Sequence, residues 1–315
     1  MLNSDEMNVA AQAHSQPLAK FNSLSNLKFL LQVSRPGLWA TTILFYLMPL
    51  GRSFNLRTPS FWLGLFYIVF PLSLLLYGVN DIVDAEGDRL NPRKGTYLFG
   101  SRGADQHRYL RWQIAAWQIP FFCFFWMLTG WRITLWFAAI LLAVYVYNVH
   151  PFALKGRPPF DVLIQSSYLL IFILSSWINN VPQLPWQTFV FGGLFAMHSH
   201  VFGEIMDIEP DQQSGRATLA TKIGRIPAKL FVATLLLIEI FLVLRYFRDP
   251  VIAFFLAAGA FFFLLDATLL WQSRPYSPSQ MRLFLWGWNI AAALGVLWNA
   301  FHGSLLIAHA RPLPS

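Results

Sequence analysis

Apolar runs of roughly membrane-spanning length alternate with short polar segments along most of the chain. A helix needs roughly 17 to 25 such residues to cross a hydrocarbon core about 30 Å thick. The runs fall near Gly37–Leu50, Phe61–Val79, Tyr109–Gly130, Trp131–Val149, Val162–Trp177, Trp186–Met206, Leu230–Tyr246, Val251–Trp271 and Leu283–Phe301. The first run is short for a span unless its helix begins upstream, near Leu27, and kinks at Pro36. The pattern predicts an all-α polytopic membrane protein with about nine transmembrane helices in one bundle.

The composition supports a lipid environment. Hydrophobic residues make up 56% of the 315 and charged residues only 12%, a balance too apolar for a soluble domain. Residues 1–26 are polar and lack the basic start and apolar core of a secretory signal, so a polar cytoplasmic tail is expected there. A single transmembrane domain is expected over residues 27–307, with a short C-terminal tail over 308–315. The one cysteine, Cys123, permits no intrachain disulfide.

The charge of the loops predicts the orientation, because Lys and Arg favour the cytoplasmic side of a membrane. With the N-terminus inside, 17 of the 23 Lys and Arg residues fall on the inner side and 6 on the outer side. The net charge of +8 is therefore mainly an excess in the inner loops, and it does not indicate nucleic-acid binding. We expect an integral protein of the cell membrane with a cytoplasmic N-terminus and an external C-terminus.

Two clusters of acidic residues follow the second and the sixth predicted helices. The first cluster comprises Asp81, Asp84, Glu86 and Asp88, and the second comprises Glu204, Asp207, Glu209 and Asp211. Each lies at the inner end of the second helix in a set of four, which indicates a duplicated four-helix unit followed by one extra helix. A carboxylate at the end of an apolar helix is costly unless a cation or a wet cavity accompanies it. We therefore expect the two clusters to face a shared polar site.

The spacing within each cluster places its oxygen ligands on one helical face. Asn80, Asp84 and Asp88 recur at i, i+4 and i+8 of an expected helix, and Asp207 and Asp211 share a face in the same way. Such hard ligands suit Mg²⁺, which takes one or two carboxylates per ion and commonly binds together with substrate phosphates. One cluster alone would be equally well explained as a solvated loop. Two clusters on one side favour Mg²⁺ held around a diphosphate.

Basic residues near the acidic clusters are candidates for binding the diphosphate oxygens. They are Arg93, Lys94, Lys155, Arg216 and Lys222. Each taken singly is equally well explained as a topology signal of an inner loop. His198 and His200 precede the second cluster at i and i+2, so they point to different helix faces and are not predicted as joint metal ligands.

The motifs resemble those of the UbiA-type intramembrane prenyltransferases. Asn80 to Asp88 fits the family's N-D-x-x-D-x-x-x-D motif, and Asp207 to Asp211 fits its D-x-x-x-D motif. The resemblance covers about residues 31–301 and implies Mg²⁺ as the cofactor. It carries over the metal ligands Asn80, Asp84, Asp88, Asp207 and Asp211 and the candidate catalytic residues Asp81, Asp84 and Asp207. The resemblance also implies that two basic residues, Lys155 and Arg35, lie near the diphosphate.

Several residues depart from the hydroxybenzoate-type members of that family. Ala85 stands where those members usually have Arg, and the stretch 91–95 replaces a longer run. The segments 76–81 and 207–211 look more like the lycopene elongase-like branch. The resemblance therefore implies a polyene or carotenoid acceptor, with a quinone-type aromatic acceptor as the alternative.

The expected reaction transfers a prenyl group from a prenyl diphosphate to a lipophilic acceptor within the membrane. Cations neutralise the leaving diphosphate, the apolar chamber excludes water, and the rings of Tyr77, Tyr147 and Tyr168 are candidates to shield the allylic cation. The residue that takes the final proton cannot be named from the sequence. Two rivals remain, a CDP-alcohol phosphotransferase and a cation transporter using paired carboxylates. No obligate protein partner is inferred.

Overall fold

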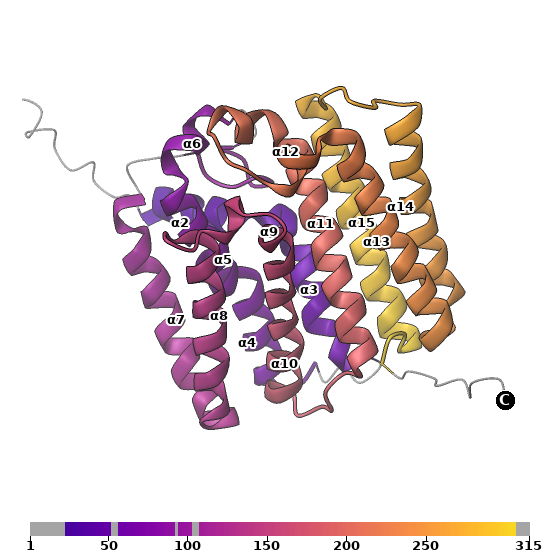
Figure 1. Ribbon diagram of the computed structural model, residues 1–315. Coiled ribbons are helices and arrows are strands. Elements are labelled where there is room, and N and C mark those ends of the chain that lie inside the picture. Colours follow the sequence, from indigo (N-terminus) through magenta and orange to yellow (C-terminus); the bar gives the residue numbers. More distant parts are fainter. Residues whose placement is uncertain (1–22, 52–55, 92–93, 103–106, 307–315) are drawn as a thin grey trace, which may run out of the picture.

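A computed structural model describes residues 23–51, 56–91, 94–102 and 107–306 of the protein. The helices are α2 (Ser23–Val33), α3 (Trp39–Leu47), α4 (Pro59–Tyr67), α5 (Ser73–Val83), α6 (Ala85–Leu90), α7 (His107–Thr129), α8 (Arg132–Asn148), α9 (Phe160–Leu163), α10 (Leu170–Ile178), α11 (Trp186–Gln213), α12 (Leu219–Ile223), α13 (Arg225–Leu242), α14 (Pro250–Thr268) and α15 (Pro278–His302) (Figure 1). The only β pairing in the described residues is an isolated bridge between Thr96 and Gly100. The predicted all-α class is confirmed.

Each of the nine predicted apolar runs contains a helix. Six helical segments of the described residues are long and apolar enough to cross a membrane: Pro59–Val83, Phe160–Ile178, Trp186–Gln213, Arg225–Phe247, Pro250–Thr268 and Pro278–His302. Helix α8 is a shorter apolar helix. The first predicted run does not continue upstream as one helix kinked at Pro36, because α2 ends at Val33, Arg35 adopts a left-handed conformation with φ of 51°, and Pro36 starts a separate turn, Pro36–Leu38.

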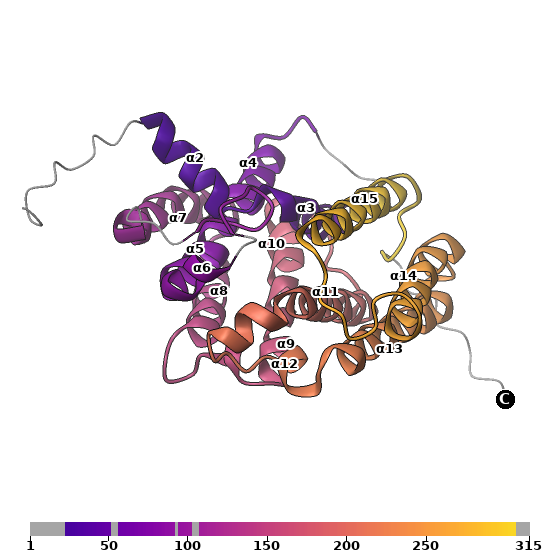
Figure 2. The same ribbon diagram turned by 90° about the horizontal axis from the view of Figure 1, so that it is seen from above.

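The helices form one bundle in which the last helix, α15, packs against an early helix, α3. Helix α13 packs between α11 and α14, α5 packs against α7 and α8, and α15 packs against α3. Seen from above, α15 lies beside α3 and closes the arrangement (Figure 2). The internal repeat itself stays a prediction.

A neighbouring helix contacts an interruption in the second span. Pro71 has no backbone N–H, and the chain around it forms a π turn over Ile68–Leu72 between α4 and α5. In a membrane an unpaired backbone group is expensive, since no water is present to satisfy it. Gln118 of α7 donates from Nε2 to the Pro71 carbonyl at 2.7 Å and accepts from the Tyr67 hydroxyl at 2.9 Å. These two hydrogen bonds join α7 to the irregular turn.

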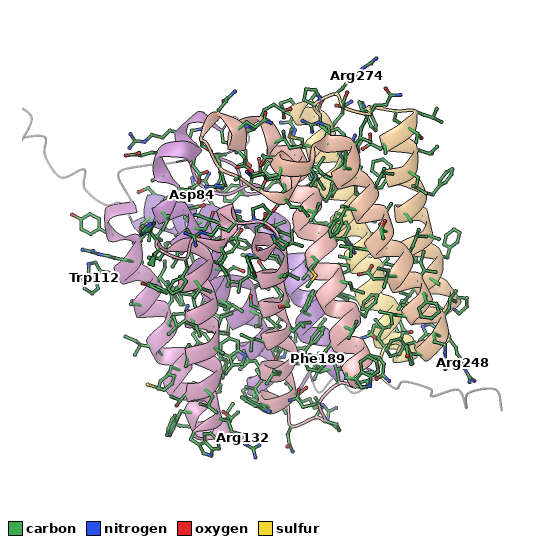
Figure 3. The ribbon with its side chains drawn as sticks, in the orientation of Figure 1. Asp84, Trp112, Arg132, Phe189, Arg248 and Arg274 are labelled. Atoms are coloured by element: carbon green, nitrogen blue, oxygen red, sulfur yellow. The ribbon has the colours of Figure 1, made fainter. Side chains whose placement is uncertain are left out.

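Three arginines are grouped at the two ends of the bundle as the loop charges predict, and which end faces the cytoplasm stays a prediction. Arg274, predicted inside, lies toward the same end as Asp84, whereas Arg132 and Arg248, predicted outside, lie at the opposite end (Figure 3). We call the end that carries Asp84 the motif end.

Candidate active site

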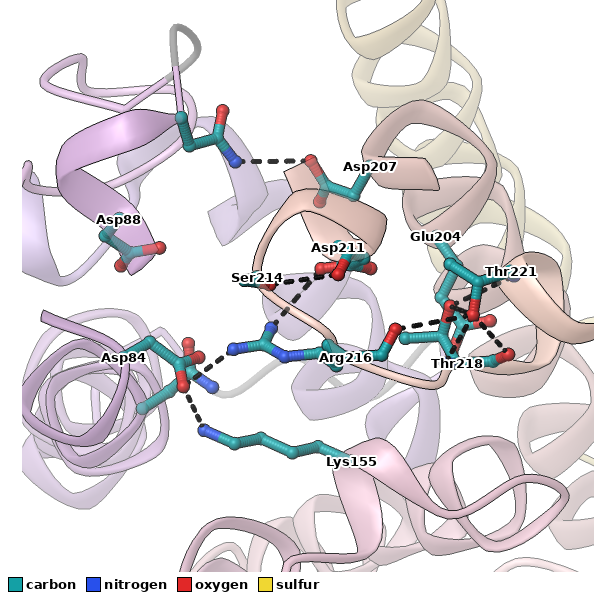
Figure 4. Close-up of polar contacts among 12 residues, drawn as sticks. Asp84, Asp88, Lys155, Glu204, Asp207, Asp211, Ser214, Arg216, Thr218 and Thr221 are labelled. Atoms are coloured by element: carbon teal, nitrogen blue, oxygen red, sulfur yellow. Dashed lines mark hydrogen bonds and ion pairs between the residues drawn. The ribbon is translucent and has the colours of Figure 1, made fainter. Parts of the chain in front are cut away.

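Both acidic motifs line one cavity at the motif end. The cavity has a volume of about 340 Å³, and its walls include Asn80, Asp84 and Asp88 from the first motif and Asp207 and Asp211 from the second. Figure 4 shows the two motifs facing each other across the side chain of Arg216. The structure therefore brings together the two clusters that the sequence separates by more than one hundred residues.

The first motif does not lie on one unbroken helix, so that prediction is wrong. Helix α5 ends at Val83, and Asp84 leaves helical geometry with φ of −93° and ψ of 7° before α6 begins at Ala85. Aspartate is a weak helix former that favours helix boundaries. The Asp84 amide still donates to the Asn80 carbonyl, and the Asp88 amide to the Asp84 carbonyl, each at 2.9 Å. The change of direction is thus small, and the three side chains still reach the cavity.

The second motif lies on the last turns of α11. This helix has 28 residues, and at 1.5 Å per residue it is about 42 Å long, which exceeds a hydrocarbon core of about 30 Å. Its end therefore extends to the membrane surface, where carboxylates cost less. Asp207 accepts a hydrogen bond from the Asn91 side-chain amide at 3.4 Å, a contact that joins the second motif to the segment following the first.

Two cations hold the carboxylates of the motifs. The Arg216 guanidinium lies 2.7 Å from Asp84 Oδ1 and 3.6 Å from Asp211 Oδ1, so it bridges both motifs. Lys155 Nζ lies 2.5 Å from Asp84 Oδ1 and 3.3 Å from Asn148 Oδ1. Burial lowers the pKa of Lys155 below its usual value, although Asp84 opposes this effect. Burial acts in the same direction on Arg216, but Asp84 and Asp211 together raise its pKa above the usual value.

Asp81 lies behind the cavity wall and holds two cations in place. Its side chain is fully buried, is absent from the cavity lining, and accepts hydrogen bonds from Arg35 at 2.7 Å, Lys94 at 3.0 Å and Ser101 at 2.7 Å. Arg35 and Lys94 themselves line the cavity. Lys94 also lies 2.6 Å from Asp88, whose pKa is raised by burial despite this pairing. Asp81 therefore acts on the cavity through Arg35 and Lys94.

Close backbone approach at two glycines positions this group. A Cβ on Gly37 would come within 2.8 Å of the Leu98 backbone, and Gly100, with φ of +93°, places a Cβ within 2.7 Å of Arg35 Nε. Only glycine fits such contacts without displacement. They allow the segment 94–102 to pack against the break after α2, which brings Lys94 and Ser101 to Asp81.

Glu204 faces a different network from its neighbours in the second cluster. One of its oxygens accepts from the Ala220 amide at 3.1 Å, while Asp161 accepts from the Leu219 amide at 2.6 Å. The two carboxylates satisfy N–H groups at the start of α12, which have no partners within that helix. They fix α12, and with it the segment carrying Arg216, above the cavity.

Arg225 of α13 binds the helix that carries the second motif, α11. It donates to the Ile205 carbonyl at 2.6 Å and forms an ion pair with Glu209. Glu209 is 41% exposed at this contact. Glu209 is therefore used in anchoring α11 and does not line the cavity.

Two predicted cations have other placements. Lys222 is exposed on α12 and is not part of the cavity lining, so the structure does not support diphosphate binding by this residue. Arg93 lies outside the described residues. Three further residues bond the predicted set: Asn91, Ser101 and Asn148. The sequence does not mark them as site residues, because uncharged polar side chains form no charge pattern. Asn91 lies in the distinctive stretch 91–95, and Asn148 ends an apolar run shortly before Lys155.

The donor set fits Mg²⁺ bound together with a phosphate-containing substrate. Among the described residues no three His, Cys, Asp or Glu side chains converge closely enough to hold a metal by themselves. Magnesium keeps several waters and usually takes only one or two carboxylates along with phosphate oxygens. Carboxylates on two facing walls, all hard oxygen donors, satisfy that requirement.

Comparisons with known proteins agree with this geometry. Residues 38–288 match the UbiA prenyltransferase family. A lycopene elongase/hydratase of Corynebacterium glutamicum is 28% identical over 291 residues, covering 89% of this chain and 99% of the relative. A lycopene elongase/hydratase of Haloarcula japonica is 30% identical over 207 residues, covering 63% of this chain and 68% of the relative.

Solved structures share the fold. A UbiA homolog from Archaeoglobus fulgidus bound to GPP and Mg²⁺ superposes with a TM-score of 0.64 at 19% identity, covering 86% of this chain and 97% of that one. The apo UbiA homolog from Aeropyrum pernix K1 gives a TM-score of 0.52 at 19% identity, with 85% and 96% covered. Since the family match extends over residues 38–288 of the 315, the chain belongs to the UbiA prenyltransferase family and is an integral membrane prenyltransferase.

Proposed function

We propose that this enzyme transfers the prenyl group of a prenyl diphosphate to a lycopene-type polyene, with Mg²⁺ as cofactor and the motif end in the cytoplasm. The observation that carries the proposal is the single cavity, which has both acidic motifs and four cations at one end. The cations are Arg35, Lys94, Lys155 and Arg216. Relatives named lycopene elongase/hydratase over 89% of the chain support the polyene acceptor.

The chain's residues have separable tasks in this reaction. Asn80, Asp84, Asp88, Asp207 and Asp211 would hold Mg²⁺, which when bound supplies positive charge to the departing diphosphate. Lys155 and Arg216 already lie beside these carboxylates and carry donors that match phosphate oxygens. When diphosphate and metal enter the cavity, Lys155 and Arg216 would exchange carboxylate contacts for phosphate contacts. No buried charge would then be left without a partner.

The cavity also has aromatic walls. The hydroxyls of Tyr77 and Tyr168 lie 3.1 Å apart, and the Arg35 guanidinium lies 4.6 Å from the centre of the Tyr77 ring. Phe45, Tyr147 and Trp288 line the same cavity. Their faces stabilise positive charge, and their bulk excludes the water that would hydrolyse an allylic cation.

The rival functions have weaker support. A transport site is expected near mid-membrane in broken helices, whereas Asp207 and Asp211 lie on the last turns of α11. A CDP-alcohol phosphotransferase belongs to a different family from the one this chain matches.

The test is prenyl transfer by purified protein in nanodiscs with dimethylallyl or geranyl diphosphate, lycopene or 4-hydroxybenzoate, and Mg²⁺ or excess EDTA. We expect a polyene product, read by mass spectrometry, only with Mg²⁺. Asp84→Asn and Asp207→Asn should abolish it, because each removes a charged metal ligand. Glu86→Gln is the matched control, since Glu86 belongs to the first cluster but is exposed outside the cavity. Equal activity of Asp84→Asn and Glu86→Gln would contradict the metal assignment, and product with hydroxybenzoate alone would contradict the acceptor.

A further inference from the structure

The two histidines that precede the second motif have different surroundings. His200 lines the cavity, and its ring packs edge-on against Tyr147 with 6.3 Å between ring centres. His198 does not line the cavity. It is buried, with Nδ1 3.2 Å from Glu239 of α13. Only His200 is therefore placed to meet a substrate.

A carboxylate oxygen lies beside one nitrogen of the His200 ring. Its Nε2 lies 3.0 Å from Glu204 Oε1, without the alignment of a hydrogen bond. That oxygen is buried and has no hydrogen-bond partner among the described residues. The other oxygen of Glu204 is fixed by the Ala220 amide. A small ring rotation would let an Nε2–H group donate to this oxygen, which leaves Nδ1 as the free nitrogen of the ring.

His200 is also at a suitable depth. It precedes Asp207 by two turns on α11, which at 1.5 Å per residue is a rise of about 10 Å. The diphosphate end of a substrate held between the acidic motifs thus lies above it, and the carbon chains lie at its level.

We propose that His200 is the general base that completes prenyl transfer, an inference that rests on the function proposed above. The C–O bond of the prenyl diphosphate breaks with its electron pair leaving on diphosphate. A double bond of the acceptor supplies the pair for the new C–C bond and leaves a cation on the acceptor. The adjacent C–H bond then gives its pair to a new double bond, and its proton goes to His200 Nδ1, while Nε2 turns to Glu204.

Other groups in the cavity are less suited to this step. Asp84, Asp88 and Asp211 are engaged by Lys155, Lys94 and Arg216. Asp207 accepts from the Asn91 amide, and the phenol of Tyr147 is a weak base. Glu204, which also lines the cavity, and the leaving diphosphate are the remaining competitors, and the experiment below separates both from His200.

The test measures diphosphate release and polyene products together, using His200→Gln and full-length protein in nanodiscs with dimethylallyl diphosphate, lycopene and Mg²⁺. We expect diphosphate release to stay within about threefold of the native rate, because ionisation precedes the proton transfer. The proton-loss product per diphosphate released should fall at least about tenfold, since a positioned base contributes about 10²- to 10⁴-fold. Imidazole added to His200→Ala should restore part of this ratio.

His302→Gln is the matched control, because His302 is exposed and stacks only on Trp298 at the end of α15. A native ratio of product to diphosphate in His200→Gln would overturn the proposal and assign the proton to Glu204 or to diphosphate. Loss of diphosphate release together with a lowered thermal midpoint would also overturn it, since it would show a structural role. Failure of the native protein to release diphosphate would instead refute the proposed function.

Discussion

Replacing Arg216 by Gln tests whether one side chain couples the two acidic motifs. Arg216 is the residue whose guanidinium contacts carboxylates of both, at 2.7 Å to Asp84 and 3.6 Å to Asp211. In the reaction the same donors would meet diphosphate oxygens. The substitution removes the positive charge but should leave folding intact, because Asp84 keeps its ion pair with Lys155 at 2.5 Å.

The size of the effect follows from the geometry of the contact. One hydrogen bond between charged groups contributes about 1.5 to 3 kcal/mol, which corresponds to about 10- to 150-fold in rate. The Arg216 side chain is 28% exposed, so water compensates part of the loss and the lower half of that range applies. We expect kcat/KM for the prenyl diphosphate to fall about 10- to 40-fold.

The assay is steady-state diphosphate release at several concentrations of prenyl diphosphate. Arg216→Lys should be intermediate, since an ammonium makes a point contact and cannot bridge two groups. Arg157→Gln is the control, because Arg157 is exposed on the loop after α8 and does not line the cavity. A kcat/KM for Arg216→Gln within about twofold of native protein would refute the bridging role.

Two further predictions concern lysines outside the cavity. Lys222→Gln should leave kcat/KM unchanged in the same assay, because Lys222 is exposed on α12, and a loss like that of Arg216→Gln would restore it to the diphosphate site. Lys229→Met should destabilise the bundle by about 3 to 5 kcal/mol, the cost of breaking a buried ion pair, since fully buried Lys229 lies 2.8 Å from equally buried Asp266. A lower thermal midpoint in detergent checks this, and a midpoint equal to that of Lys222→Met would contradict it.

The site pairs buried carboxylates with cations, and burial of either charge without its partner would be unfavourable. Asp84, Asp88 and Asp211 are all buried, and each has a cation within 3.6 Å. Burial of an unpaired carboxylate costs far more than burial of a paired one. The arginine and lysine partners therefore stabilise the cavity before substrate arrives and remain available as phosphate ligands when it does.

The sequence alone determined the all-α class, the positions of the apolar helices and the chemistry of the two motifs, whereas six helical segments of the described residues, not nine, are long and apolar enough to span a membrane. Membrane helices need long apolar runs, which are local in sequence and readable one segment at a time. The acidic motifs were visible for the same reason, since carboxylates at the ends of such runs stand out against an apolar background. The spacing in the second motif also gave its shared face correctly, because α11 continues unbroken to Gln213.

Only the tertiary structure decided which polar groups act together. Three features depend on contacts between helices that no single segment encodes. They are the helix boundary at Asp84, the position of Asp81 behind the cavity wall and the hydrogen bond of Glu204 to α12. Lys222 and Arg216 look alike in the sequence, yet the turn before α12 directs only Arg216 into the cavity. The same holds for His198 and His200, whose positions differ by about 200° around α11, so packing against α13 buries one while the cavity receives the other.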